Sequence, residues 1–330
     1  MPPGPLPTGR DSGAGNDLMH IIDEATSAAL ITRHMAYDAI RASLAAAVLP
    51  DCQSFPVVIG NGPGEGQRFG IKSATTPTLT GFKVGSYWPG NEARGETNHH
   101  SSIVLLHPES GRIAAVIEGG KVNTFRTAAA NAVAADVLAH PDAATLTVFG
   151  NGHQAHHEVL ALALVRPIRQ VLVVGRDPAR VAAFCDGLQA QGINARPEAA
   201  EAACRQADII TTVTTSRAPL FDAAWVRPGT HVSSMGSDTV GKQELPVALL
   251  REGTLFCDLE RQSRVVGEFQ HAPADVPATS IGHVLDGSHP GRTRDDEITV
   301  FDSSGISVQD LYIGEAILQA WLRSQENQGH

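Results

Sequence analysis

The sequence predicts an α/β protein with two domains, one of which contains a doubly wound parallel sheet. From residue 127 onward, short apolar runs of strand length alternate with segments at helical spacing, which is typical of a parallel sheet covered by helices. Residues 55–118 instead alternate short β-rich runs with Gly, Pro and Asn turns, which indicates an antiparallel sheet. The length of 330 residues is sufficient for two cores.

The composition is that of an ordinary soluble globular protein, with 42% hydrophobic and 18% charged residues. A net charge of −10 argues against nucleic acid as the main partner. The apolar runs are far shorter than the roughly 20 residues that span a bilayer, so we expect no membrane segment. The cysteines are far apart and lack zinc-site spacing, so we expect no metal, no disulfide framework and a reducing, cytoplasmic location.

The elements before the parallel sheet follow from local patterns. Residues 1–17 are rich in Pro and Gly and lack the apolar core of a signal peptide, so they are expected to form a disordered leader. Residues 30–49 have apolar positions at helical spacing with charge on one side, which predicts an amphipathic helix. The antiparallel segment 55–118 comes next, and from Thr127 the Ala-rich run TAAANAVAADVLAH predicts another helix.

The parallel strands are predicted where apolar runs stand between helical segments. They cover residues 145–149, 170–175, 208–213, 230–235 and 254–258. One more strand and a final helix follow in ITVFDSSGISVQDLYIGEAILQAWL. Ser307 and Asp310 have the spacing of a capping box, and Val308, Leu311, Leu318 and Leu322 form an apolar stripe.

The turn in LTVFGNGHQAHHEVLALALV carries the first functional signal. Gly150, Gly152 and Ala155 form G-x-G-x-x-A between a predicted strand and a predicted helix. That arrangement brings backbone N–H groups and a helix N-terminus against a pyrophosphate, which predicts a Rossmann dinucleotide-binding domain. The alternative is a tight turn required only for packing.

The end of the second parallel strand indicates which dinucleotide is preferred. An NAD-binding domain usually has an acidic residue there to hold the ribose, whereas this chain has Gly175 followed by Arg176. An arginine without a preceding carboxylate suits a 2′-phosphate, so NADP(H) is favoured over NAD(H). The alternatives are a ribose contact from Asp177 and a merely solvated Arg176.

Several ordered motifs resemble those of the ornithine cyclodeaminase/mu-crystallin family. They are GFKVGSYWPGN, FRTAAANAVAADVLA, VFGNGHQA, HVSSMGSDTVGKQEL and ITVFDSSGISVQDL, and the similarity extends from about residue 25 to 325. FGIKS and GEFQHA look most like the branch with iminosuccinate reductase, ketimine reductase and alanine dehydrogenase.

The resemblance implies a homodimer whose subunit has two domains. The first, residues 18–126 with 304–330, would bind substrate and form the dimer, and the second, residues 127–303, would be the Rossmann domain. The implied reaction is hydride transfer at the α-carbon of a small 2-imino acid or cyclic ketimine carboxylate. Alternatives are a cyclodeaminase that recycles bound NAD and a protein that binds a dinucleotide and a small ligand without turnover.

The family's functional residues map onto positions of this chain. Lys83 and Asp238 are the implied catalytic pair, and Lys72, Lys83, Arg126 and His99 the implied substrate contacts. Lys72 or Arg68 would replace a carboxylate-binding arginine of the family, because Ile59 stands near its place. The implied cofactor contacts are His100, Arg126, Gly150, Gly152, His153, Gln154, Arg176, Thr214, Val232, Ser233, Ser234, Met235, Lys242 and Ser303.

Several of these side chains also have a simpler interpretation, and His99 and His100 can equally be solvent-facing histidines. Lys83 alone would be read as a solvated strand residue, Arg126 as a charge at a helix start and Asp238 as a turn residue. His153 and His157 have the spacing of two metal ligands on a helix, but the HExxH acid is missing and the turn is assigned to the cofactor.

Overall fold

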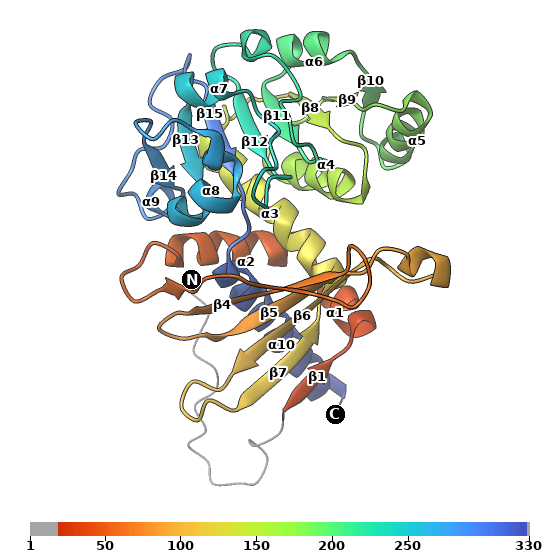
Figure 1. Cartoon of the computed structure of the whole chain (residues 1–330), viewed down its shortest axis with the longest axis vertical. Helices are drawn as coiled ribbons and strands as arrows, with labels where there is room; N and C mark the ends of the chain where they lie inside the picture. The colour runs from red at the N-terminus through yellow and green to blue at the C-terminus, as the bar shows by residue number, and fades with distance from the viewer. Residues whose placement is uncertain (1–18, 329–330) are drawn as a thin grey trace. The chain divides into compact units, whose positions relative to one another are not determined.

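The computed structural model describes residues 19–328 and divides the chain into two compact units. Unit 1 consists of the chain up to Arg126 together with the segment from Ile306 onward, and unit 2 is Thr127–Gly305. The expected return to the first domain at residue 304 therefore comes at Ile306. The predicted leader, residues 1–17, lies outside the described residues. Figure 1 shows the elements of both units.

Unit 1 contains a mainly antiparallel sheet in the order β1-β7-β6-β5-β4-β2, with β3 also paired to β4. The antiparallel interpretation of residues 55–118 is correct. The parallel pairing of β1 with β7 was not predicted, because β1 is too short to show a pattern. The strands are β1 (His20–Ile22), β2 (Gln53–Ser54), β3 (Val58–Asn61), β4 (Arg68–Thr75), β5 (Thr80–Tyr87), β6 (His99–Leu106) and β7 (Ile113–Glu118).

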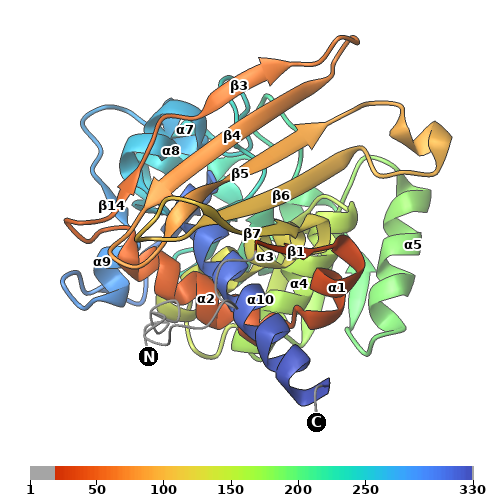
Figure 2. The ribbon, with the colours of Figure 1, turned by 90° about the horizontal axis from the view of Figure 1, so that it is seen from below.

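Helices cover one face of this sheet. The C-terminal helix α10 (Ser307–Gln328) packs against α2 (Arg33–Ala46) and against β4, β5 and β6. Figure 2 shows α10 lying along the sheet, with the short helix α1 (Glu24–Leu30) near its far end. Chain ends far apart in sequence therefore build one core.

The start of α10 corrects one expectation. The predicted capping box is wrong, because the Ser307 hydroxyl donates to the Ser73 carbonyl and Asp310 accepts from Lys83 instead of from the helix backbone. The apolar stripe is largely as predicted, since Val308, Leu311 and Leu318 are buried. The packing of α10 against the sheet thus engages both polar side chains of the expected cap in tertiary hydrogen bonds.

Unit 2 contains a parallel sheet in the order β10-β9-β8-β11-β12-β15-β13-β14. The predicted strands are all present, whereas the three-residue strands β10 and β14 were not predicted. The strands are β8 (Thr145–Phe149), β9 (Gln170–Val174), β10 (Ala195–Pro197), β11 (Ile209–Thr212), β12 (His231–Ser234), β13 (Thr254–Cys257), β14 (Ala278–Ser280) and β15 (Thr299–Asp302).

The helices of unit 2 follow the strands as a doubly wound fold requires. The helix expected from Thr127 is α3, which begins earlier, at Gly120, so its residues 120–126 belong to unit 1 and the rest to unit 2. The helices are α3 (Gly120–Leu138), α4 (His153–Val165), α5 (Pro178–Gln189), α6 (Ala200–Gln206), α7 (Val247–Glu252), α8 (Glu260–Val266) and α9 (Gly282–Leu285). Strand order reverses between β8 and β11, and ligands of such sheets bind at the carboxyl ends of the strands flanking that point.

Candidate active site

The glycine turn after β8 has the form that a pyrophosphate requires. Gly150 has a φ of 115°, and a Cβ there would lie 2.7 Å from the Val213 carbonyl oxygen. Gly152 caps α4 without a side-chain hydrogen bond, and a Cβ there would meet nothing within 4 Å. The buried Nδ2 of Asn151 has no hydrogen-bond partner among the described residues. The turn therefore combines open space, a helix N-terminus and an unused donor, and it fits a dinucleotide phosphate.

The two residues after the turn begin α4. The His153 ring packs against the His157 ring at 4.8 Å between centroids. Gln154 Nε2 donates to Glu158 Oε1 at 2.7 Å, and the buried Glu158 also accepts from Asn131 Nδ2 at 2.9 Å. Within residues 19–328 there is no group of three His, Cys, Asp or Glu side chains arranged to hold a metal ion.

The end of β9 presents Arg176 to solvent. A Cβ on Gly175 would lie 2.6 Å from Val181 Cγ2, so close packing requires glycine before the arginine. Asp177 caps α5 and accepts from the backbone N–H groups of Ala179 and Arg180. The carboxylate that was the alternative ribose ligand is thus engaged by its own helix, and Arg176 is exposed beside it.

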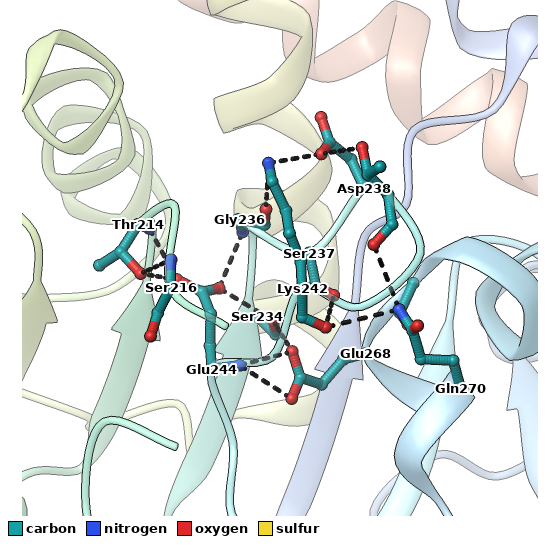
Figure 3. A network of polar contacts seen from close by, with 12 residues as sticks. Thr214, Ser216, Ser234, Gly236, Ser237, Asp238, Lys242, Glu244, Glu268 and Gln270 are labelled. Carbon is teal, nitrogen blue, oxygen red and sulfur yellow. Dashed lines mark hydrogen bonds and ion pairs between the residues drawn. The ribbon is translucent and has the colours of Figure 1, made fainter. Parts of the chain in front are cut away.

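The loop after β12, residues 235–243, is anchored by a buried carboxylate that the sequence interpretation did not identify. Glu244 Oε1 accepts from the Thr214 N–H at 2.6 Å and the Thr214 hydroxyl at 2.8 Å, and Oε2 accepts from Gly236 N–H at 2.9 Å. A Cβ on Gly236 would lie 2.2 Å from the Thr214 carbonyl oxygen. Glu244 therefore joins the loops that follow β11 and β12, as Figure 3 shows.

The predicted catalytic acid lies in this loop and pairs with a predicted cofactor residue. Lys242 Nζ is 2.6 Å from Asp238 Oδ1 and 3.1 Å from the Gly236 carbonyl oxygen. The Asp238 side chain is 56% exposed, so solvent screens the pair. Gln270 holds the far side of the loop, because its Oε1 accepts from Gly241 N–H at 2.7 Å. Its Nε2 donates to the Lys242 carbonyl at 3.4 Å (Figure 3).

The remaining predicted cofactor contacts of unit 2 lie along β12 and after β15. Val232 is part of the apolar core, and the Ser233 hydroxyl is 3.0 Å from His231 Nε2. Met235 follows the end of the strand and is nearly buried, and the Ser303 N–H donates to the Ser234 carbonyl. The side chains of Val232 and Ser233 are thus committed to the interior, whereas Met235 is at the carboxyl edge.

Unit 1 gathers Lys83 and Arg126 into one buried polar cluster. Lys83 Nζ on β5 is 2.8 Å from Asp310 Oδ1 and 3.1 Å from Asn123 Oδ1. Arg126 donates to Asn123 Oδ1 and Gln309 Oε1, both at 2.8 Å, and its Nε is 3.4 Å from Asp310 Oδ1. Asn123, Gln309 and Asp310 were missed as site residues, although SVQDL at the start of the final helix was recognised as a motif.

Burial dominates the acid–base behaviour of Lys83. Desolvation lowers the pKa of Lys83 to about 8; Asp310 opposes this effect, and the positive charges of Arg126 and Lys72 add to it. Lys72 is directly opposite Lys83 in the β4–β5 pairing, so both side chains belong to the same face. The cluster therefore contains a lysine that titrates close to neutral pH.

Polar atoms around this cluster remain available for a ligand. Gln309 Nε2, Asp310 Oδ2 and the Ser101 hydroxyl are buried without hydrogen-bond partners in the described part of the chain. Gly85 lies on β5, two residues after Lys83, and a Cβ there would meet nothing within 4 Å. Buried polar groups left unpaired are costly unless a ligand satisfies them.

The two predicted pocket histidines are on β6 of unit 1. His99 packs on Tyr87 at 4.7 Å between ring centroids, and His100 Nε2 is 3.5 Å from Asn91 Nδ2. Both rings are exposed. Lys83, Arg126 and the histidines belong to unit 1, and Asp238 and the glycine turn to unit 2, so the meeting of Lys83 with Asp238 stays a prediction.

A glycine turn at the switch point of a doubly wound sheet, in a chain whose second unit has a buried lysine–arginine cluster, is typical of a dinucleotide-binding enzyme. The chain belongs to the ornithine cyclodeaminase/mu-crystallin family, whose profile it matches over residues 36–325. It is an enzyme of the kind that acts on C–N bonds with a nicotinamide dinucleotide.

Relatives of known activity align with most of this chain. The iminosuccinate reductase of Paracoccus denitrificans is 33% identical over 91% of this chain and 96% of its own. The crystal structure of that reductase in complex with NAD+ has a TM-score of 0.86, with 93% of this chain and 97% of that one covered. An archaeal alanine dehydrogenase dimer with bound NAD is 30% identical, with a TM-score of 0.87 and 93% and 97% covered.

No helix in the described part of the chain is both long and apolar enough to cross a membrane.

Proposed function

We propose that this protein reduces the C=N bond of a small 2-imino carboxylate to the amino acid with NADPH or NADH. The observation that carries the proposal is the buried Lys83 ammonium, which lies beside Asp310 and Arg126 and has a pKa lowered to about 8. A group that titrates near neutral pH is suited to donating a proton during a reaction. The similarity to an iminosuccinate reductase and to an alanine dehydrogenase supports a reaction at a C–N bond.

The residues of unit 1 can serve both ends of such a substrate. A bound nicotinamide supplies a hydride to the imine carbon. Lys83 donates the proton that the imine nitrogen takes up, and Arg126 binds the carboxylate through its parallel N–H groups. Asp238 is the second candidate for the proton relay, and His99 is a further substrate contact.

The charges near Lys83 favour a substrate with two carboxylates. The groups that act on its charge are two cations, Arg126 and Lys72, and one carboxylate, Asp310. The positive charges of Arg126 and Lys72 would attract a second substrate carboxylate as well as the first. Iminosuccinate, named in the Paracoccus denitrificans relative, has two carboxylates.

The cofactor is proposed to be held by unit 2, with NADP(H) preferred over NAD(H). The Gly150–Gly152 turn and the first turn of α4 bind the pyrophosphate, and His153, Gln154, Thr214, Met235, Lys242 and Ser303 lie at the same edge of the sheet or close to it. Arg176, which is exposed just after β9, would contact the 2′-phosphate. The two solved relatives carry NAD. The proposed preference for NADP(H) therefore rests on Arg176 of this chain and not on the relatives.

The assembly is proposed to be a homodimer formed through unit 1. The edge strand β3 exposes Val58 at 58% and Ile59 at 67% of their surface. Exposed apolar residues on an open sheet edge favour pairing with a second copy, and the alanine dehydrogenase relative is described as a dimer.

The test is an NADPH-oxidation screen of 2-oxo acids with ammonia or methylamine, together with cyclic ketimines. Oxaloacetate with ammonia is expected to give the highest kcat/KM, followed by smaller monocarboxylates. Ammonia release from ornithine without net change in NAD(P)H would support a cyclodeaminase instead. Dinucleotide binding without turnover of any of these compounds would support a ligand-binding protein.

A further inference from the structure

The Ser234 hydroxyl at the end of β12 lies between two buried carboxyl groups. Its oxygen is 3.0 Å from Glu244 Oε2 and 3.1 Å from Glu268 Oε2 (Figure 3). A hydroxyl has one hydrogen and can donate it to one of the two oxygens only. If both carboxyls were ionised, one of these contacts would be an oxygen–oxygen approach without a hydrogen.

The hydrogen-bond donors around the pair indicate which carboxyl carries a proton. Glu244 accepts from two backbone N–H groups and from the hydroxyls of Thr212 and Thr214, which together stabilise a carboxylate. Glu268 accepts from the N–H groups of Glu244 and Leu245. Glu244 is therefore the better-stabilised anion, and Glu268 can donate to Ser234, which in turn donates to Glu244.

Glu268 lies next to another buried carboxyl group and has no ion-pair partner among the described residues. Its own N–H faces the buried Asp302 carboxyl, whose pKa is raised well above its usual range by burial and by the nearby Asp258. Neither Glu244 nor Glu268 forms an ion pair within residues 19–328. Among the basic side chains of these segments, Lys242 pairs with Asp238 and Arg264 with Glu260, the His271 ring contacts the Lys242 carbonyl, and the Arg217 guanidinium lies beside Gly241.

We infer that Glu268 is a positioning residue that carries a proton in the resting protein and, through Ser234 and Glu244, holds the loop of residues 235–243 in shape. The loop depends on this pair because Glu244 binds the Gly236 N–H while the Glu244 N–H binds Glu268. Ionisation of Glu268 would place two buried anions against one hydroxyl and loosen the loop that carries Asp238 and Lys242.

The pH range follows from the direction of the shift. Burial is the main cause that raises the pKa of Glu268 to about 7, with the charge of Glu244 adding to it. An opened loop exposes Glu268 and returns its pKa toward about 4.3. Opening therefore becomes about tenfold more favourable per pH unit between about pH 5 and 7 and levels off above pH 7. The closed loop is therefore most stable near pH 5, the acidic limit of this range.

The test is amide hydrogen exchange of residues 235–243 in the full chain from pH 5 to 8, corrected for the intrinsic exchange rate. Wild type should show the rise and plateau just described. Glu268→Gln, which keeps the carbonyl acceptor and replaces the donor O–H by N–H, should show neither. The exposed Glu252→Gln variant on α7 is the matched control and should behave as wild type.

Two further measurements test the protonation of Glu268 and the role of the Ser234 bridge. Infrared difference spectra between wild type and Glu268→Gln should show a protonated-carboxyl band that disappears as the pH passes about 7. Ser234→Ala, which keeps both carboxyls but removes the bridge, should raise exchange of the loop at every pH. Exchange of the wild-type loop that does not change between pH 5 and 7, or an unchanged profile in Glu268→Gln, overturns the proposal.

The importance of this loop for activity rests on the proposed function, but the placement of the proton does not. Exchange and infrared spectra are measured without substrate or cofactor. A protein that reduces no imine and still shows the Glu268-dependent exchange profile would disprove the proposed function alone, and an active reductase with a flat profile would disprove this inference alone.

Discussion

Arg176 is the residue on which the proposed cofactor preference depends. Arg176→Ala should lower the NADPH/NADH affinity ratio by roughly ten- to a hundredfold, because a charge-assisted bond to a phosphate contributes about 1.5 to 3 kcal/mol. Fluorescence titration with both dinucleotides measures the ratio. Arg205→Ala, which removes an exposed arginine of α6 paired to Glu201, is the control and should leave it unchanged. An unchanged ratio in Arg176→Ala would remove that residue from 2′-phosphate recognition.

Lys83 gives the reaction a predicted pH dependence. A proton donor must be protonated before transfer, so kcat/KM for imine reduction should fall as the pH rises through about 8, the pKa of Lys83. Because ammonium and imine also titrate, the profile is best recorded with a preformed cyclic ketimine and corrected for substrate ionisation.

The same position separates the two candidate proton donors. Lys83→Met should reduce kcat by about 10² to 10⁴, the usual contribution of a general acid. Removing one partner of a buried ion pair also destabilises the fold, so Lys83→Met/Asp310→Asn is the companion variant. Asp238→Asn should keep NADPH binding, and a larger loss of kcat there than in the Lys83 variants would transfer the proton relay to Asp238.

Lys72 is the residue that tests the second carboxylate. Lys72→Met should lower kcat/KM for oxaloacetate with ammonia more than for pyruvate with ammonia, by roughly tenfold or more in their ratio, since about 1.4 kcal/mol corresponds to a factor of ten. Lys121→Met, an exposed lysine at the start of α3, serves as the control. Equal losses on both substrates would argue against a dicarboxylate.

The turn between β8 and α4 offers a matched pair of substitutions at the level of an element. Gly150→Ala should destabilise the protein by about 1 to 3 kcal/mol, because the residue has positive φ and the new Cβ would lie 2.7 Å from a carbonyl oxygen. Gly152 has an ordinary φ of −91° and open space, so Gly152→Ala should fold normally and lose dinucleotide affinity. Urea unfolding and NADPH titration distinguish the two effects; full affinity in Gly152→Ala would contradict the assigned pyrophosphate site.

Assembly is a property of the whole molecule, and β3 is its predicted determinant. Ile59→Lys should shift the protein from dimer to monomer at micromolar concentration, because a charge replaces an exposed apolar side chain on the open sheet edge. Light scattering measures the mass. Val265→Lys on α8 replaces a comparably exposed valine and should leave the mass unchanged. A wild-type monomer would rule out the proposed dimer directly.

Local patterns in the sequence determined the fold class, the main strands of both sheets and the glycine turn. Alternation of apolar runs with helical spacing depends on neighbouring residues, and so does the G-x-G-x-x-A pattern between a strand and a helix, so both are visible without tertiary contacts. The three-residue strands β1, β10 and β14 are too short to have a pattern, and their pairing with longer neighbours decides them.

Only the tertiary structure decided which side chains share a site. Lys83 and Asp310 are 227 residues apart in sequence, and the packing of α10 on the sheet brings them together and diverts Asp310 from the expected helix cap. Glu268 meets Glu244 in the same way, from a separate segment. The pKa values of Lys83 and Glu268 depend on desolvation by these contacts, because the free energy of a buried charge is determined by its surroundings.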